Sequence, residues 1–255
     1  MFLSFLAAEA TEDQIDLVKW ITIGVLLLLV IVILLLSTIG KKQKLDTRTV
    51  VYAAICVSTS FALSYLKFSM PYGGSITFAS LVPLMIFAYA FGPLRGLVAG
   101  LVYGLLQFIQ DPWFLNGIQF VLDYLLAFAA IALVPIFKKV VKNQKASVLL
   151  GVAAFGIARL AMHICSGIVF VQAGYITEVE WMANLADIGA FLYSLVYNGL
   201  YVLPDTLICA AVFVYLLYSG AFSKLLSRLS VVAKPAPVVG ETREETENLP
   251  EDQKK

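Results

Sequence analysis

Long runs of apolar residues, separated by short polar connections, dominate the chain. A membrane-spanning helix needs about 20 consecutive, mostly apolar residues. Runs that approach this length cover residues 19–39, 48–66, 76–92, 94–110, 118–137, 148–171 and 188–219. Because these runs are as long as helices and do not alternate between apolar and polar positions, they predict an all-α integral membrane protein.

The composition supports this class and excludes several others. Of the 255 residues, 60% are hydrophobic and 14% are charged, whereas soluble proteins carry about 45–50% and about 25%. The net charge of +1 provides no general basic field for a nucleic acid. The three cysteines are far apart and lie within apolar runs, which argues against a disulfide-stapled secreted domain.

Charged residues in the connections predict how the chain crosses the membrane. Lys and Arg accumulate on the cytoplasmic side of membrane proteins. One set of connections is basic and holds Lys41, Lys42, Lys44, Arg48, Arg95, Lys138, Lys139, Lys142, Lys145, Lys224 and Arg228. The opposite set is mostly acidic and holds Glu9, Glu12, Asp13, Asp16, Lys67, Asp111, Glu178, Glu180 and Asp187. This alternation requires seven spans, with the N-terminus outside and the C-terminus in the cytoplasm.

Three regions are expected along the chain. Residues 1–40 form an extracellular N-terminus and an extra transmembrane helix, whose apolar centre can face lipid on all sides. A signal sequence is the alternative, but the acidic flank and the long apolar core favour an anchor. Residues 41–222 form a six-helix membrane domain. Residues 223–255 form a disordered cytoplasmic tail, because residues 232–255 are charged and poor in large apolar groups.

Ionisable side chains inside the predicted spans are the strongest indication of a site. A charge at the centre of a bilayer costs about 2.5–3.5 kcal/mol on insertion scales, so it faces a cavity or a partner. Asp123, Arg159 and His163 fall in the outer halves of their spans, as do Tyr193 and Asn198. Their common depth predicts a polar pocket that opens to the exterior. A structural Asp123–Arg159 ion pair and a hydrogen-bonded core histidine are the competing interpretations.

Further polar and aromatic residues extend this candidate site. Gln119 lies four residues before Asp123, so the two share a helix face with Asn116. Asp205 lies nearer the middle of its span, and its role stays open. Aromatic residues near the level of the site are Trp113, Tyr124, Trp181 and Tyr193. Such residues are typical of every membrane interface, or they stack on a flat or cationic ligand.

Small residues recur every four positions in the second run, at Ala54, Ser58 and Ala62. They lie on one helix face, where small side chains let another helix approach closely. The stripe predicts either a docking face for a membrane partner or ordinary packing within the bundle, and the spacing alone does not separate the two.

Motifs of common enzymes are missing from the sequence. It contains no G-x-x-x-x-G-K-[ST], no H-E-x-x-H, no G-x-S-x-G and no Cys/His cluster. With one histidine, a metal site would need several distant carboxylates. We therefore expect no enzyme, no metal and no cofactor in this chain, and we favour binding or transport of a small molecule.

Four stretches together resemble one known family. They are GGSITFASLVPLMIFAYAFGPLRGLVAGLVYGLLQ (73–107), QFVLDYLLAF (119–128), RLAMHICSG (159–167) and YSLVYNG (193–199). The resemblance covers roughly residues 48–219 and is to the ThiT/YuaJ group, the thiamine-specific substrate-binding (S) components of energy-coupling-factor (ECF) transporters. It implies a six-helix S-component bundle, to which the first span adds one N-terminal helix.

The resemblance also implies roles for individual residues. The acid of the family's D/E-Tyr motif contacts thiamine and matches Asp123. The other implied substrate-binding positions are Tyr124, Arg159, His163, Tyr193, Asn198 and Trp113, to which helical spacing adds Gln119. The stripe Ala54, Ser58 and Ala62 resembles the surface by which S components dock on their transmembrane coupling protein.

The sequence departs from the family pattern at several positions. A lactococcal-type member has Glu where this chain has Asp123, and Lys where it has Arg159. Two stacking tryptophans of such members align with Gly74 and Val171. Candidate replacements are Trp181, Tyr175 and Tyr72.

The resemblance implies a vitamin importer subunit that binds thiamine in an outward-facing pocket. Delivery inward would follow coupling to a transmembrane partner and two ABC-type ATPases, which use the ATP. Because Arg159 would repel a cation, we expect it to pair with Asp123 or Asp205, and the glycine-containing loop 67–75 to close over the pocket. The alternatives are an S component for another vitamin or a thiamine precursor, and a stand-alone ion-coupled carrier with Asp205 as its ion site.

Overall fold

The computed structural model describes residues 47–113 and 117–233. The predicted first span (19–39), Asn116 and the tail beyond residue 233 lie outside the described residues. The helices are α3 (Thr47–Ser64), α4 (Val82–Phe91), α5 (Pro93–Gln110), α6 (Gly117–Phe120), α7 (Ala127–Ala129), α8 (Gln144–Gln172), α9 (Glu180–Ile188), α10 (Ala190–Tyr218) and α11 (Ala221–Ala233). A π-helix, η1 (Val121–Leu126), and two 3₁₀ helices, η2 (Ala130–Leu133) and η3 (Ile136–Lys139), continue α6.

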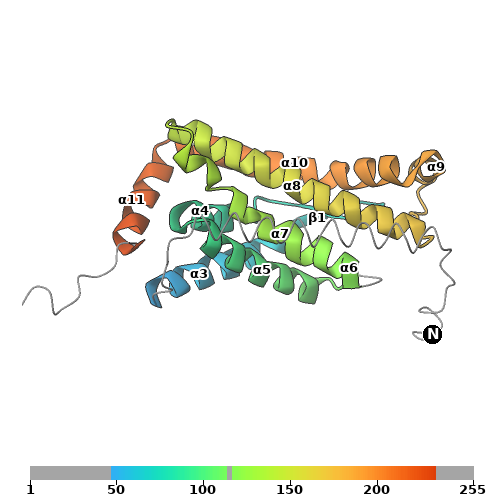
Figure 1. Ribbon diagram of the computed structural model, residues 1–255, viewed down its shortest axis with the longest axis horizontal. Coiled ribbons are helices and arrows are strands. Elements are labelled where there is room, and N and C mark those ends of the chain that lie inside the picture. Colours follow the sequence, from blue (N-terminus) through green and yellow to red (C-terminus); the bar gives the residue numbers. More distant parts are fainter. Residues whose placement is uncertain (1–46, 114–116, 234–255) are drawn as a thin grey trace, which may run out of the picture.

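The described residues contain three helical stretches that are long and apolar enough to cross a membrane: Gly117–Lys139, Gln144–Gln172 and Ala190–Tyr218. They coincide with the last three predicted spans. Helices α8 and α10 have 29 residues each, so each is about 43 Å long and exceeds the roughly 30 Å of a bilayer core. The two run side by side along the longest axis of the molecule (Figure 1).

The expected span over 76–92 is wrong in its first half. Residues Lys67–Ser69 form strand β1, which pairs antiparallel with strand β2, Ser75–Thr77. Helix α4 begins only at Val82, with a proline in its first turn, and has ten residues, about 15 Å. The hydroxyl side chains of Thr77 and Ser80 have hydrogen-bond partners here, which favours a hairpin and a turn over a helix in this part of the run.

The tail expected to be disordered from residue 223 is also corrected, because α11 continues to Ala233. Phe222 and Leu229 are buried, and Leu226 packs against the same core. These residues recur with helical spacing, so one face of α11 is apolar. The sequence-based boundary missed this face because the segment also carries charged residues.

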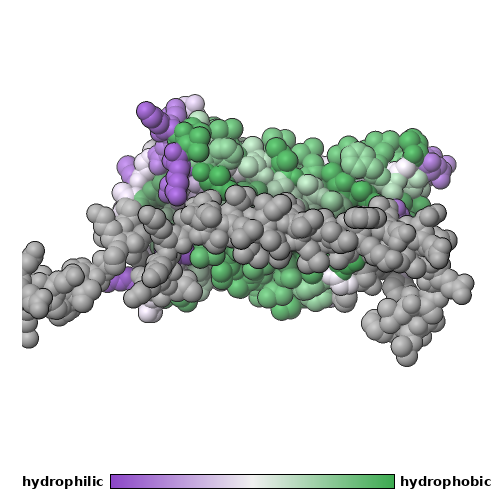
Figure 2. All heavy atoms as spheres, in the orientation of Figure 1, coloured by the Kyte–Doolittle hydropathy of each residue, from purple (hydrophilic) through white to green (hydrophobic). Residues whose placement is uncertain are grey.

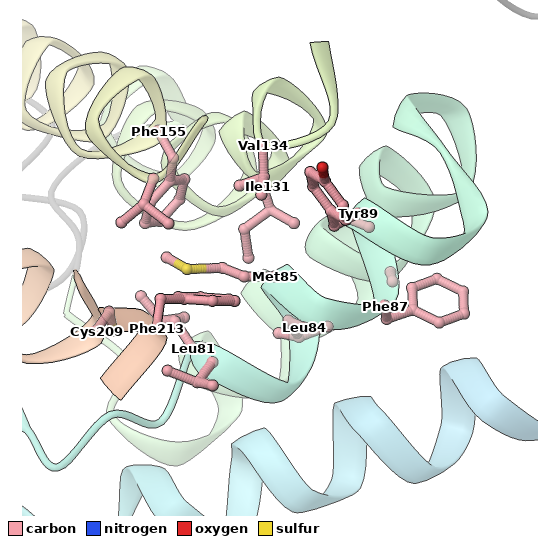
Figure 3. Close-up of a cluster of buried hydrophobic side chains, with 14 of the residues drawn as sticks. Leu81, Leu84, Met85, Phe87, Tyr89, Ile131, Val134, Phe155, Cys209 and Phe213 are labelled. Carbon is pink, nitrogen blue, oxygen red and sulfur yellow. The ribbon is translucent and has the colours of Figure 1, made fainter. Parts of the chain in front are cut away.

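Helix α4 lies at the centre of the hydrophobic core. Leu84 and Met85 are fully buried in it, and Phe155 of α8 and Phe213 of α10 belong to the same cluster. Figure 3 shows Met85 between Phe155 and Phe213, with Ile131 and Val134 beside them. On the coloured part of the space-filling view, hydrophobic side chains lie between the two ends and hydrophilic ones gather toward the ends (Figure 2).

Interactions near the two ends of the molecule agree with the division of the predicted connections into a mostly acidic set and a basic set. Lys67 Nζ lies 3.1 Å from Asp111 Oδ2, which joins two connections of the mostly acidic set. In the basic set, Lys145 Nζ lies 3.9 Å from the centre of the Tyr218 ring, where α8 begins and α10 ends. The direction of the molecule relative to the membrane stays a prediction.

Candidate ligand-binding site

Asp123 lies within the π-helix η1, one turn of which is wider than an α-helical turn. Such π-turns are frequent at functional sites. Helix α5 approaches this segment closely, because Gly104 places no side chain against the Tyr124 carbonyl. The Asp123 side chain retains 20% of its exposure, in contrast to the other acid in a predicted span, Asp205, at 1%. Asp123 is therefore the carboxylate that a ligand can reach.

Two residues of α8 hold the Asp123 carboxylate. His163 Nδ1 lies 2.7 Å from Oδ1, and the Ser166 hydroxyl donates to Oδ2 at 2.6 Å. Each carboxylate oxygen accepts more than one hydrogen bond, so further acceptor positions remain for a ligand. The expected alternative, an ion pair between Asp123 and Arg159, is not formed; Asp123 pairs with His163 instead.

His163 connects the acid to α10. The Asn198 amide donates to the His163 carbonyl at 3.1 Å and to the Ser194 carbonyl at 2.8 Å, and the Tyr201 hydroxyl donates to Asn198 Oδ1 at 2.6 Å. The His163 side chain is 8% exposed, and its Nε2 has no hydrogen-bond partner among the described residues. With Nδ1 bonded to the carboxylate, Nε2 of a neutral imidazole is an acceptor left for a ligand.

Arg159 and Asp205 form a second polar cluster, one helical turn from His163 along α8 and one helical turn from Tyr201 along α10. Arg159 Nη1 lies 2.5 Å from Asp205 Oδ2, and both side chains are buried. The backbone N–H and the hydroxyl of Thr77 donate to Asp205 Oδ1 at 3.0 and 2.6 Å. Of the two acids expected to pair with Arg159, the structure selects Asp205, and the guanidinium charge is compensated away from Asp123.

A row of aromatic rings extends from the polar clusters toward α9. Tyr193 and Tyr197 stack with their centroids 5.7 Å apart, and Tyr72 meets Tyr197 at 5.8 Å and Trp181 at 6.3 Å. The Tyr193 hydroxyl accepts from the Thr177 N–H at 3.0 Å. Partial burial raises the pKa of Tyr72, which lies in the hairpin loop, so its hydroxyl stays protonated. Two of the candidate replacements for the missing tryptophans, Tyr72 and Trp181, therefore lie together, whereas Tyr175 packs on Phe170.

The glycine-containing loop is already packed against α10. Gly73 and Gly74 both have positive φ angles, 102° and 75°. A Cβ at Gly73 would overlap the Tyr197 hydroxyl, and a Cβ at Gly74 would overlap the Tyr201 ring. A tryptophan at position 74 does not fit beside Tyr201, which accounts for one departure from the family pattern.

Trp113 and Tyr124 form a separate contact at the rim. The Tyr124 hydroxyl donates to the carbonyls of Asp111 and Trp113 at 2.8 and 3.1 Å and accepts from the Trp113 N–H at 3.0 Å. Trp113 is 59% exposed, and its ring centroid lies 5.9 Å from that of Phe170. This hydroxyl orients the loop that carries Trp113, and the ring remains accessible. Gln119, also expected in the site, is buried.

Replacing Tyr124 by Phe should weaken ligand binding about tenfold, because it frees the loop at Trp113 while leaving the Asp123 cluster unchanged. Titration calorimetry measures the affinity, and Trp fluorescence reports the mobility of Trp113. The matched control is Tyr65→Phe, at an exposed position directly after α3. Unchanged affinity together with a more mobile Trp113 would exclude this loop from the site.

The structure brings Asp123, His163 and Asn198 together, as the sequence predicted, whereas Tyr193 stacks on Tyr197 in the aromatic row. Sequence reasoning missed Ser166, Thr77 and Tyr197. Ser166 lies three residues after His163 and Tyr197 four after Tyr193, so helical spacing indicated both. Thr77 gave no such indication, because residues 76–92 were expected to form a helical span.

The small-residue stripe faces away from the bundle. Ala54, Ser58 and Ala62 are all exposed on α3, and Ser58 donates only to carbonyls of its own helix, at 2.8 and 3.2 Å. Among the described residues nothing packs over this face. Of the two interpretations of the stripe, internal packing is therefore wrong for the part of the bundle that the structure describes.

Comparison with known proteins identifies the family. The family of thiamine transporter proteins (Thia_YuaJ) matches residues 50–224, which is most of the described chain. The chain belongs to this family. Its members are transporters and not enzymes, and the apolar helices described above make this member a multi-pass membrane protein.

The two ThiT proteins below agree with this assignment. The thiamine transporter ThiT of Bacillus subtilis (strain 168) is 33% identical over 162 residues, which cover 59% of this chain and 78% of that protein. The structure of ThiT from Listeria monocytogenes is similar with a TM-score of 0.57 and 26% identity, over 70% of this chain and 96% of that one. The S component of a bacterial ECF transporter matches with a TM-score of 0.46 and 20% identity, over 69% of this chain and 96% of that one.

Proposed function

We propose that this chain is the substrate-binding membrane subunit of an ECF-type vitamin importer and that it binds thiamine beside Asp123. The observation that carries the proposal is the Asp123–His163–Ser166 cluster, which presents a partly exposed carboxylate and an unpaired imidazole nitrogen within the membrane domain. Membership of the thiamine transporter family supports the choice of ligand.

Each part of thiamine has a counterpart in this site. The aminopyrimidine ring offers donors to the Asp123 carboxylate and to His163 Nε2. The thiazolium cation is attracted to the same carboxylate by about 4 kcal/mol at 4 Å, for an effective dielectric constant near 20. An aromatic face over the cation, from the row Tyr72, Tyr193 and Tyr197, adds roughly 0.5–2 kcal/mol.

The Arg159–Asp205 pair makes the site compatible with a cation. An uncompensated guanidinium one helical turn from His163 would oppose binding of a positive charge. Because Asp205 neutralises Arg159 at 2.5 Å, the net charge that the ligand meets is set by Asp123.

Titration calorimetry of the purified protein with thiamine tests the proposal. We expect saturable binding of one thiamine, and no binding would remove the proposal. Competition by a panel of vitamins and thiamine precursors separates thiamine from a related flat ligand, a possibility raised by the two missing tryptophans. Stronger displacement by another member of the panel would reassign the ligand.

A stand-alone ion-coupled carrier is the other candidate, with Asp205 as its ion site. Arg159 and Thr77 already occupy this carboxylate, which leaves it poorly suited to bind a cation. Uptake driven by a pH gradient in vesicles without any ATPase would favour the carrier over the ECF subunit.

We further propose that the face Ala54, Ser58 and Ala62 docks on the coupling protein, that two ABC-type ATPases supply the energy from ATP, and that the N-terminus is outside. The exposure of all three small residues supports the docking face.

The proposed orientation is tested by labelling single cysteines, placed at residue 142 or at residue 178, in intact cells with a reagent that does not cross the membrane. Only the cysteine at residue 178 should be labelled.

Replacing Ser58 by Trp should prevent docking while thiamine binding stays unchanged, because the bulk lies on an exposed face remote from Asp123. Co-purification with the coupling protein and calorimetry measure the two effects. Thr59→Trp, at an exposed position about 100° around α3 from Ser58 and so off this face, is the control. If Ser58→Trp still co-purifies in full amount, the docking face lies elsewhere.

A further inference from the structure

The hairpin formed by β1 and β2 is attached to α10 at its base and contacts α10 again at its tip. At the base, Thr77 donates two hydrogen bonds to Asp205 Oδ1. At the tip, Gly73 and Gly74 lie against the rings of Tyr197 and Tyr201. The hairpin therefore lies along the same helix that supplies Asn198 to the proposed thiamine site.

Asp205 joins this hairpin to both long helices at once. Its Oδ2 is bound by Arg159 of α8, and its Oδ1 accepts the N–H and hydroxyl protons of Thr77. Because the Thr77 hydroxyl proton points to Asp205, the neighbouring Ser80 hydroxyl at 2.7 Å donates to Thr77 Oγ1. Charge-assisted hydrogen bonds of this kind are about twice as strong as neutral ones. The attachment thus combines a buried charge with a carboxylate whose two oxygens both have partners.

We propose that Asp205 is a positioning residue: through Thr77 it fixes the hairpin against α10 and thereby sets how long a ligand beside Asp123 stays bound. The part about the ligand rests on the proposed function, whereas the attachment of the hairpin does not. The tip of the hairpin lies against Tyr201, whose hydroxyl donates to Asn198 of the proposed site, so a change at Thr77 can reach the ligand although Thr77 lies outside the site.

The Thr77 hydroxyl allows the attachment to be changed without touching the ion pair. Thr77→Val has nearly the same shape, keeps the backbone N–H bond and leaves Arg159–Asp205 intact. Thr77→Ser restores the hydroxyl and serves as the rescue. Thr59→Val, at an exposed position on α3, is the matched control for the substitution itself.

Hydrogen exchange followed by mass spectrometry, on the full chain without ligand, tests the attachment. In Thr77→Val, amides of residues 66–78 should exchange about tenfold faster, while those of α8 and α10 stay unchanged. Thr77→Ser and Thr59→Val should behave like the unmodified protein. Equal protection of residues 66–78 in Thr77→Val and the unmodified protein would overturn the proposal.

Thiamine dissociation, measured by stopped-flow Trp fluorescence, tests the consequence for the ligand. We expect dissociation about tenfold faster in Thr77→Val and normal in Thr77→Ser. Faster exchange of the hairpin with an unchanged dissociation rate would overturn the role in ligand retention. If the unmodified protein binds no thiamine, the proposed function fails, whereas the exchange result still decides the attachment.

Discussion

Replacing Asp123 by Asn is expected to weaken thiamine binding by at least about 100-fold. Asn keeps the size and one acceptor oxygen but removes the charge that attracts the thiazolium, and this attraction amounts to about 4 kcal/mol at 4 Å in a partly polar site. The His163 bond also changes, because a neutral amide no longer favours a proton on Nδ1. Titration calorimetry gives the affinity directly.

The matched control is Asp111→Asn, which removes an acid from the same end of the molecule. Asp111 pairs with Lys67 at the surface, where its side chain is 72% exposed. Screening by solvent makes its effect on a ligand small. Equal losses of affinity in the two variants would mean that general charge, and not the Asp123 site, attracts the ligand.

Replacing Arg159 by Gln is expected to lower the melting temperature by roughly 10 °C, because it leaves the Asp205 carboxylate buried without its counter-charge. Breaking a buried ion pair from one side costs about 3–5 kcal/mol. The double variant Arg159→Gln with Asp205→Asn removes both charges and keeps an acceptor for Thr77. It should recover at least half of the lost stability, as measured by thermal unfolding in detergent.

Lys67→Gln breaks the surface ion pair with Asp111, so its loss of stability can be compared with the loss caused by breaking the buried Arg159–Asp205 pair. An exposed pair contributes at most about 1 kcal/mol, so the expected change in melting temperature is a few degrees or less. If Arg159→Gln is no less stable than Lys67→Gln, the Arg159–Asp205 pair does not stabilise the fold. The same conclusion follows if the double variant is less stable than Arg159→Gln.

The sequence was sufficient to predict the class of the fold and most of the residues that meet in the site. Arg159 and His163 are four apart on one helix, and Tyr193 and Asn198 share the next long helix, so both sets had to lie at similar depths in neighbouring spans. The cost of burying charge then required that they face one another and not lipid.

The pairing of acids with bases was not predictable in the same way. Which carboxylate meets Arg159 depends on how far α8, α10 and the Asp123 segment are rotated about their axes. The π-turn at 121–126 changes that rotation locally, and the sequence VLDYLL carries no feature that announces it. Asp123 is consequently matched to His163, and Asp205 to Arg159.

The hairpin and α11 were missed because hydrophobicity alone does not determine the element. Residues 76–92 are apolar enough for a span, yet the hydroxyls of Thr77 and Ser80 find partners only in a turn and a strand. In α11 the apolar residues follow the helical period, but the nearby charged tail lowered the average hydropathy of the region.

The most direct measurement is a density map of the purified protein with thiamine bound. The account predicts ligand density in hydrogen-bond contact with Asp123 and His163 Nε2, with the thiazolium ring beside the tyrosines of α10. Density for the ligand at a different location, with protein side chains packed against Asp123, would contradict it.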